Sequence, residues 1–155
     1  MSKFTALATA VFAIATAATV YDASALQITG NRLIEQASSD CGDLMNCYVT
    51  FSPVPIGKRL VITDVSCRAM IPKNESIYYS LLNGTKSNGS KTEQETYLTM
   101  TKIGDAPYGG TSIWQVNQKV THVLLAGQRP YIGMYRTTDS LFNTGTDCSI
   151  SGILE

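Results

Sequence analysis

The sequence predicts an all-β fold: an antiparallel β-sandwich, jelly-roll-like, with about seven or eight strands, behind an N-terminal signal peptide. Two observations predict the strands. The apolar stretches after residue 46 are short, rich in Val, Ile, Thr and Tyr, and bounded by Gly, Pro, Asn or Asp, which is typical of strands. Helical periodicity is nearly absent from the same region.

The first 25 residues have the features of a signal peptide. Lys3 supplies a positive charge, residues 4–20 form an Ala-rich apolar run, and Ala23, Ser24 and Ala25 are the small residues that a signal peptidase prefers. A membrane anchor is the alternative, but four threonines dilute the run and the Ala-x-Ala site follows it. We therefore expect cleavage after Ala25 and export of one domain, residues 26–155, to the periplasm or outside the cell.

The charge balance limits the classes of partner. The chain has 12 basic and 12 acidic residues and no basic cluster. Nucleic acid and anionic membranes attract proteins through concentrated positive charge, so neither is expected as a partner, nor is membrane insertion after cleavage. A glycan or a protein remains as the expected partner, and an oligomer is possible.

The strand candidates follow one another along the mature chain, with one helix-like segment before them. Residues 31–38 place Leu33, Ile34 and Ala37 at helical spacing behind a possible Asn31 cap. A first strand is possible at residues 26–29, and a bend is expected at 119–121 within one long segment. The remaining strands are predicted at residues 48–52, 59–71, 76–82, 95–102, 112–125, 130–137 and 147–154.

The four cysteines predict disulfides, because an exported protein meets oxidising conditions. Two-residue alternation places Cys148 on the inward face of the last strand, and it places these residues on one face of the segment after Lys58: Val61, Thr63, Val65, Cys67 and Ala69. Of the three possible connectivities, this favours Cys67 with Cys148, which leaves Cys41 with Cys47. Without a Cys-x-x-Cys pair, no metal or other cofactor is expected.

Two loops stand out between the strands. Residues 83–94 contain Asn-Gly twice, which indicates a hairpin tip, although both pairs also fit the N-glycosylation pattern. Residues 105–111 surround Tyr108 with Pro and Gly, which predicts that its ring is exposed. Asp105 and Tyr108 are therefore candidate binding residues.

Signals for catalysis are weak. His122 is the only histidine and lies in an apolar strand, which favours a structural role. No nucleophile elbow or phosphate-binding loop occurs in the sequence. The alternative function is a small secreted hydrolase whose acids meet only in the fold, Asp64 with Glu75 or Glu95.

Aromatic residues supply the remaining functional signal. Trp114 alternates with core positions, which favours burial, whereas several tyrosines could build a stacking surface for sugars or peptides. The aromatic residues considered are Tyr78, Tyr97, Tyr108, Trp114, Tyr131 and Tyr135. The sequence thus predicts an exported, non-enzymatic protein that acts by binding a glycan or a protein, or by structural association in the cell envelope or outside the cell. An inhibitor or effector acting on another protein fits the same features.

Overall fold

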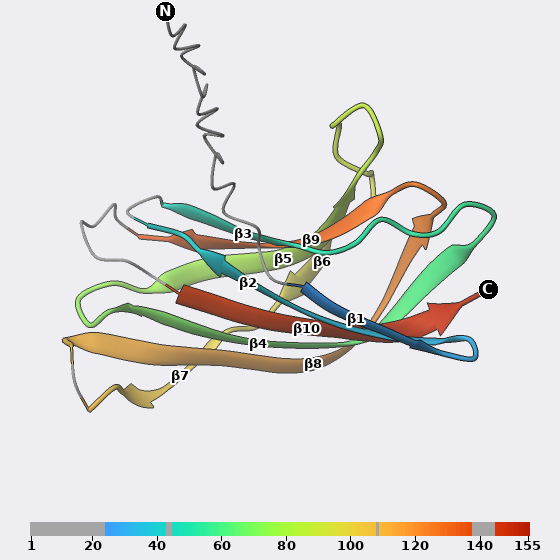
Figure 1. The fold of residues 1–155 in the computed structure, drawn as a ribbon. Coiled ribbons are helices and arrows are strands. Elements are labelled where there is room, and N and C mark those ends of the chain that lie inside the picture. Colours follow the sequence, from blue (N-terminus) through green and yellow to red (C-terminus); the bar gives the residue numbers. More distant parts are fainter. Residues whose placement is uncertain (1–23, 43–44, 108, 138–144) are drawn as a thin grey trace, which may run out of the picture.

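The computed structural model describes residues 24–42, 45–107, 109–137 and 145–155. Within these residues the chain forms ten strands and no helix, in two antiparallel sheets packed face to face (Figure 1). The predicted all-β sandwich is confirmed.

The larger sheet has six strands in the order β1-β2-β10-β4-β8-β7. Neighbouring strands in this sheet are antiparallel. Their bounds are β1 Ser24–Thr29, β2 Arg32–Asp40, β10 Gly145–Leu154, β4 Arg59–Pro72, β8 Thr111–Leu125 and β7 Thr101–Asp105.

The smaller sheet has four strands in the order β3-β9-β5-β6 and lies above the larger sheet in Figure 1. Its strands are β3 Asn46–Thr50, β9 Arg129–Arg136, β5 Ile77–Thr85 and β6 Thr96–Leu98. One face of each sheet packs into the shared core and the other face points outward.

The helix expected at residues 31–38 is wrong, because these residues form β2. Leu33, Glu35 and Ala37 are buried while the residues between them are exposed, a period of two. The carboxylate of Glu35 occupies a core position, where it accepts hydrogen bonds from the backbone N–H and the hydroxyl of Ser52. A two-residue turn with Gly30 at φ 61° joins β1 to β2.

The alternation expected in β4 holds for only part of the strand. The register of β4 against both neighbours shifts around Thr63, which acts as an extra residue. Val65 and the residues after it keep the expected face, but before the shift Leu60 and Ile62 are buried and Val61 is not. Placing Val61 and Thr63 on the core face was therefore wrong.

Two other segments show how the chain connects the sheets. The same register shift falls opposite residues 119–122 of β8, where the bend was expected, and β8 is one continuous strand. The single strand expected at 95–102 is instead two short strands, β6 in the smaller sheet and β7 in the larger one. Met100 lies between them and packs against the core.

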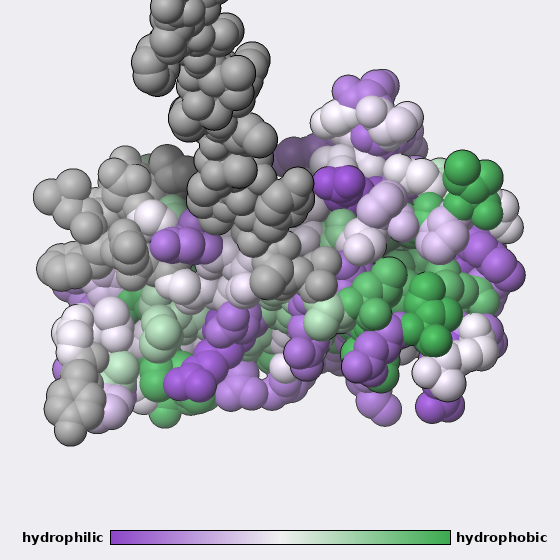
Figure 2. All heavy atoms as spheres, viewed as in Figure 1, coloured by the Kyte–Doolittle hydropathy of each residue, from purple (hydrophilic) through white to green (hydrophobic). Residues whose placement is uncertain are grey.

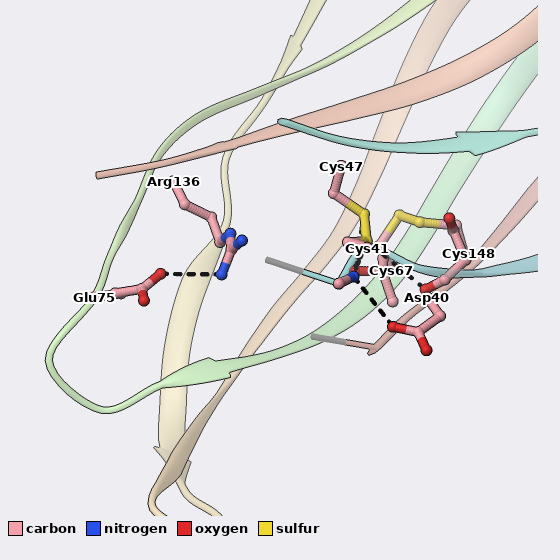
Figure 3. The surroundings of a disulfide bond; sticks show 10 residues. Asp40, Cys41, Cys47, Cys67, Glu75, Arg136 and Cys148 are labelled. Carbon is pink, nitrogen blue, oxygen red and sulfur yellow. Dashed lines mark hydrogen bonds and ion pairs between the residues drawn. A yellow bond between two sulfur atoms is a disulfide. The ribbon is translucent and has the colours of Figure 1, made fainter. Parts of the chain in front are cut away.

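The core lies between the sheets and is closed at one end by two disulfides. Cys67 bonds to Cys148, its direct neighbour across β4 and β10, and Cys41 bonds to Cys47 (Figure 3). The hydroxyl of Thr146 contacts both sulfur atoms of the second bridge. The two bridges indicate an oxidising, non-cytoplasmic environment. Among the described residues, no helix is long and apolar enough to cross a membrane.

Candidate functional site

Six tyrosines gather on the outward face of the smaller sheet, and we call this surface the tyrosine face. Alternation explains it in β9, where Ile132 and Met134 point into the core and Tyr131, Gly133 and Tyr135 point outward. The neighbouring strands keep the same period across the sheet. The tyrosine face consists of Tyr48, Tyr78, Tyr79, Tyr97, Tyr131 and Tyr135.

The rings form one connected cluster. Tyr79 and Tyr135 stack with their centroids 4.1 Å apart and their planes 10° apart. Tyr48 packs edge-on against Tyr131 at 5.7 Å and against Tyr135 at 6.1 Å. Such offset and edge-to-face contacts are favourable arrangements of aromatic rings. Contacts between the rings therefore help to hold them in place.

Two further rings extend the cluster along β5 and onto β6. Tyr78 contacts Tyr79 at 4.8 Å and Tyr135 at 6.3 Å, next to a register shift in β5. Tyr97 of β6 lies 6.4 Å from Tyr79. Contacts between rings thus join all four strands of the smaller sheet.

Five of the six rings form a buried layer and an exposed layer, and Tyr79 is half-buried. Tyr131 and Tyr135 are buried, with 5% and 7% of their surface exposed. Tyr48, Tyr78 and Tyr97 are 41%, 57% and 66% exposed. The buried rings contact the exposed rings of Tyr48 and Tyr78, and Tyr97 contacts the half-buried Tyr79.

The hydroxyl groups of the buried layer stay protonated at neutral pH. Burial raises the pKa of Tyr135, and the hydrogen bond between its hydroxyl and that of Tyr48, 3.2 Å apart, raises it further. Burial also raises the pKa of Tyr131, against the opposing effect of the positive charge on Lys91. The phenols of Tyr131 and Tyr135 therefore keep their O–H hydrogen, which can be donated in a hydrogen bond, at and around neutral pH.

Polar groups border the tyrosine face at the β5–β6 hairpin. The buried Asn83 amide donates to a carboxylate oxygen of Glu95 at 3.0 Å and accepts from the hydroxyl of Thr92 at 2.6 Å. Aromatic rings beside fixed amide, carboxylate and ammonium groups are the usual lining of a site for a polar ligand.

The larger sheet presents a different outward surface. A shallow groove of about 790 Å³ crosses it, and its lining residues include Gln36, Ser66, Arg68, Gln115 and Asp147 but no aromatic ring. In Figure 2 hydrophobic side chains gather where β1 lies, and the large exposed hydrophobic residues of that strand are Leu26 and Ile28. This surface offers hydrogen bonds without the stacking surface of the tyrosine face.

Of the two binding residues predicted from the sequence, the structure describes Asp105, which lies in the larger sheet and not on the tyrosine face. Tyr108 lies outside the described residues. Asp105 ends β7, where its carboxylate pairs with Lys102 at 2.9 Å and with Lys73 at 3.6 Å. The amines of Lys102 and Lys73 lower its pKa, the hydrogen bond from Lys102 being the largest cause.

The structure does not bring the acids of the alternative hydrolase together. Asp64 lies outward on the larger sheet and bonds to Thr63 and Ser151, and the hydrogen bond from Thr63 lowers its pKa. Glu75 is buried against Arg136 (Figure 3), and Glu95 lies at the smaller sheet. These acids face different surroundings, so they form no shared carboxylate pair.

His122 and Trp114 have structural positions. His122 is buried, its Nδ1 lies 2.9 Å from the hydroxyl of Thr96, and burial lowers its pKa to about 4. Trp114 packs against the core, as expected, and its indole N–H donates to Ser112. In the described part of the chain, no three His, Cys, Asp or Glu residues are grouped as metal ligands would be.

Sequence reasoning found four members of the tyrosine face and missed Tyr48 and Tyr79. Alternation could have found Tyr48, which lies between the inward residues Cys47 and Val49, but not Tyr79 beside Tyr78, because a register shift in β5 interrupts the alternation there. Comparison of the sequence with protein-family models and with curated proteins finds no match.

Proposed function

We propose that the protein is an exported, non-enzymatic binding protein that holds a glycan on the tyrosine face. The observation that carries this proposal is the layered tyrosine cluster, in which the buried rings of Tyr131 and Tyr135 contact the exposed rings of Tyr48 and Tyr78, and Tyr79 contacts the exposed ring of Tyr97. A rigid cluster loses little conformational entropy when a ligand binds, so its contacts contribute more to affinity.

The chemistry of tyrosine suits a sugar. A pyranose has an apolar C–H face and a rim of hydroxyls, and a tyrosine has an apolar ring and a polar hydroxyl. The exposed rings of Tyr78 and Tyr97 could stack on C–H faces while Glu95 and the tyrosine hydroxyls accept and donate hydrogen bonds at the rim.

A protein partner or structural association is the second form of this function. The residues that surround the rings favour the sugar, because the aliphatic side chain on this face, Leu81, is buried. Tyrosine also anchors protein interfaces, but the buried centres of such interfaces are depleted of charged residues, and Glu95 carries a charge beside these rings.

Export is part of the proposal. It rests on the signal-peptide features of residues 1–25 and on the two disulfides, which form and persist in oxidising compartments. Sequencing the N-terminus of the secreted protein would test this step, and we expect the mature chain to begin at Leu26.

A glycan array tests the binding function. The full chain is expressed with its own leader, recovered after export, and applied to neutral and acidic oligosaccharides. We expect a defined set of glycans to bind, and we expect Tyr78→Ala and Tyr97→Ala to lose most of that binding. Ile103→Ala, an exposed residue on β7 of the other sheet, is the matched control and should bind as the wild type does. Equal binding by all three variants, or no glycan binding at all, would refute the proposal.

A further inference from the structure

One end of the tyrosine face carries a row of three residues with two positive charges. Thr85 of β5 pairs with Arg129 of β9 on one side and with Lys91 of the β5–β6 hairpin on the other. Residues directly opposite one another in antiparallel strands point to the same face. Neighbouring strands are about 4.8 Å apart, so the backbones of Lys91 and Arg129 lie roughly 10 Å apart with Thr85 between them.

The register also places this row beside the tyrosines. Asn83, two residues before Thr85 on the same face of β5, pairs with Tyr131. The charge on Lys91 acts on the hydroxyl of Tyr131, which places the ammonium group next to the buried ring layer. Lys91 and Arg129 therefore lie on the same outward surface as the tyrosine rings, at one end of it.

Both positive charges lie on exposed side chains, and that of Lys91 also interacts with the hydroxyl of Tyr131. Lys91 and Arg129 are exposed, and neither forms an ion pair with a described residue. The ion pairs of the described chain lie elsewhere, at Arg59 with Glu155, at Asp105 with its two lysines, and at Arg136 with Glu75. A single anionic group over Thr85 could reach both cations and the Thr85 hydroxyl.

We propose that the ligand is an acidic oligosaccharide, with a carboxylate or sulfate held between Lys91 and Arg129 and its sugar rings stacked on the exposed tyrosines. This inference rests on the proposed function. Leu81, which pairs with Tyr97, precedes Thr85 by four positions in β5. The two residues are therefore about 13 Å apart along the strand. A short oligosaccharide is long enough to join the cation row to the exposed ring of Tyr97.

Glu95 is the opposing charge at this site. Its carboxylate accepts from Asn83, and its negative charge acts on Tyr131 together with the positive charge of Lys91. A second carboxylate near the bound anion weakens binding by repulsion. Removing this charge should therefore strengthen binding of an acidic sugar, whereas removing either cation should weaken it.

The test compares one oligosaccharide in two forms by titration calorimetry at low salt. The probes are a uronic-acid oligosaccharide and its carboxyl-reduced neutral form. The wild-type chain should bind the acid form about tenfold more tightly, as expected for charge-assisted hydrogen bonds. Lys91→Gln and Arg129→Gln should each lose most of this difference and leave the neutral affinity unchanged.

Two further variants complete the test: one should strengthen binding of the acid form, and the other is a control. Glu95→Gln should raise the affinity for the acid form, because it removes repulsion and keeps an oxygen acceptor for Asn83. Lys58→Gln, an exposed lysine outside the smaller sheet, should change neither affinity. All four changes are at exposed side chains, and thermal unfolding would verify that each variant folds.

The outcomes distinguish the acidic ligand proposed here from the glycan-binding function on which it rests. Equal affinity for both forms, with binding still lost in Tyr97→Ala, would overturn the acidic ligand and leave the glycan function standing. Binding of neither form, with no other glycan bound, would overturn both. Tighter binding of an acidic peptide or a single-stranded oligonucleotide through Lys91 and Arg129 would overturn the assignment to carbohydrate.

Discussion

The ring of Tyr48 lies over the backbone of Gly133 in the adjacent strand. A Cβ atom at residue 133 would approach ring carbons of Tyr48 and of Tyr135 at 3.3 Å. Residue 133 is the position between Tyr131 and Tyr135 on the outward face of β9, and it pairs directly with Tyr48. The missing side chain thus lets the exposed ring of Tyr48 reach the buried ring layer.

Gly133→Ala should displace Tyr48 and Tyr135 by a few tenths of an ångström. We expect a loss of about 1 kcal/mol in the free energy of unfolding, since overpacking of this kind costs about 1–3 kcal/mol. Urea unfolding measures it. Gly104→Ala in β7 is the control, because nothing lies within 4 Å of the new Cβ there. An equal effect of both substitutions would contradict the close packing at residue 133.

The buried His122 predicts loss of stability in acid. Its pKa is lowered from 6.5 to about 4 by burial, so between these values the unfolded chain binds a proton that the folded chain excludes. The contribution of neutral His122 is complete above pH 6.5 and declines as the pH falls toward 4, by about 3 kcal/mol in total.

Urea unfolding at pH 7 and at pH 4.5 measures this dependence. His122→Gln cannot titrate, while the carboxylates titrate equally in both proteins. The wild type should therefore lose more stability between the two pH values than the variant does. Equal losses would show that His122 does not contribute to the pH dependence.

The two disulfides should differ in their contributions because they close loops of different length. Cys67 and Cys148 are 81 residues apart, and Cys41 and Cys47 are six apart. The chain-entropy model gives about 4.5 kcal/mol for the longer loop and about 2 kcal/mol for the shorter one. Double alanine variants measured by denaturant unfolding without reductant should follow this order, and the reverse order would contradict the model.

The buried ion pair between Glu75 and Arg136 should contribute to the free energy of unfolding. The carboxylate oxygen lies 3.1 Å from the guanidinium, and both side chains have 2% or less of their surface exposed. Glu75→Gln should cost about 2 kcal/mol, because it removes the charge from a carboxylate that accepts a hydrogen bond from a buried guanidinium. Glu93→Gln at an exposed hairpin position is the control and should change the unfolding free energy by less than about 0.5 kcal/mol.

Much of the fold could be predicted because alternation, turn residues and cysteine placement agree along most strands. The bend in β8 and the pairing of Cys67 with Cys148 followed from local pattern. The helix prediction for β2 failed because Glu35 interrupts the apolar alternation, and its burial depends on Ser52, which lies in another segment. The turn at Gly30 was the available signal for a hairpin there.

Other features depend on contacts that a linear pattern does not contain. The extra residue at Thr63 reverses the faces of β4, and the division of 95–102 between two sheets follows from where Met100 meets the core. The first Asn-Gly pair, at Asn83, lies within β5, whereas the second, at Asn88, forms the turn, where its side chain accepts from Ser90.

The tyrosine face could be predicted only in part. Single strands show which rings point outward, but the strand order β3-β9-β5-β6 decides that they meet. The cation row depends even more on register, since Lys91 and Arg129 are brought together by their shared neighbour Thr85.

NMR mapping of a bound glycan is the most direct test of whether the tyrosine face is the binding site. Ring resonances of the tyrosines are followed while a glycan that binds the full exported chain is added. We expect the largest shifts on the exposed rings of Tyr48, Tyr78 and Tyr97, and no change at Gln36, Ser66 and Gln115 on the outward face of the larger sheet. Shifts confined to that groove, with the tyrosine rings unmoved, would contradict this expectation.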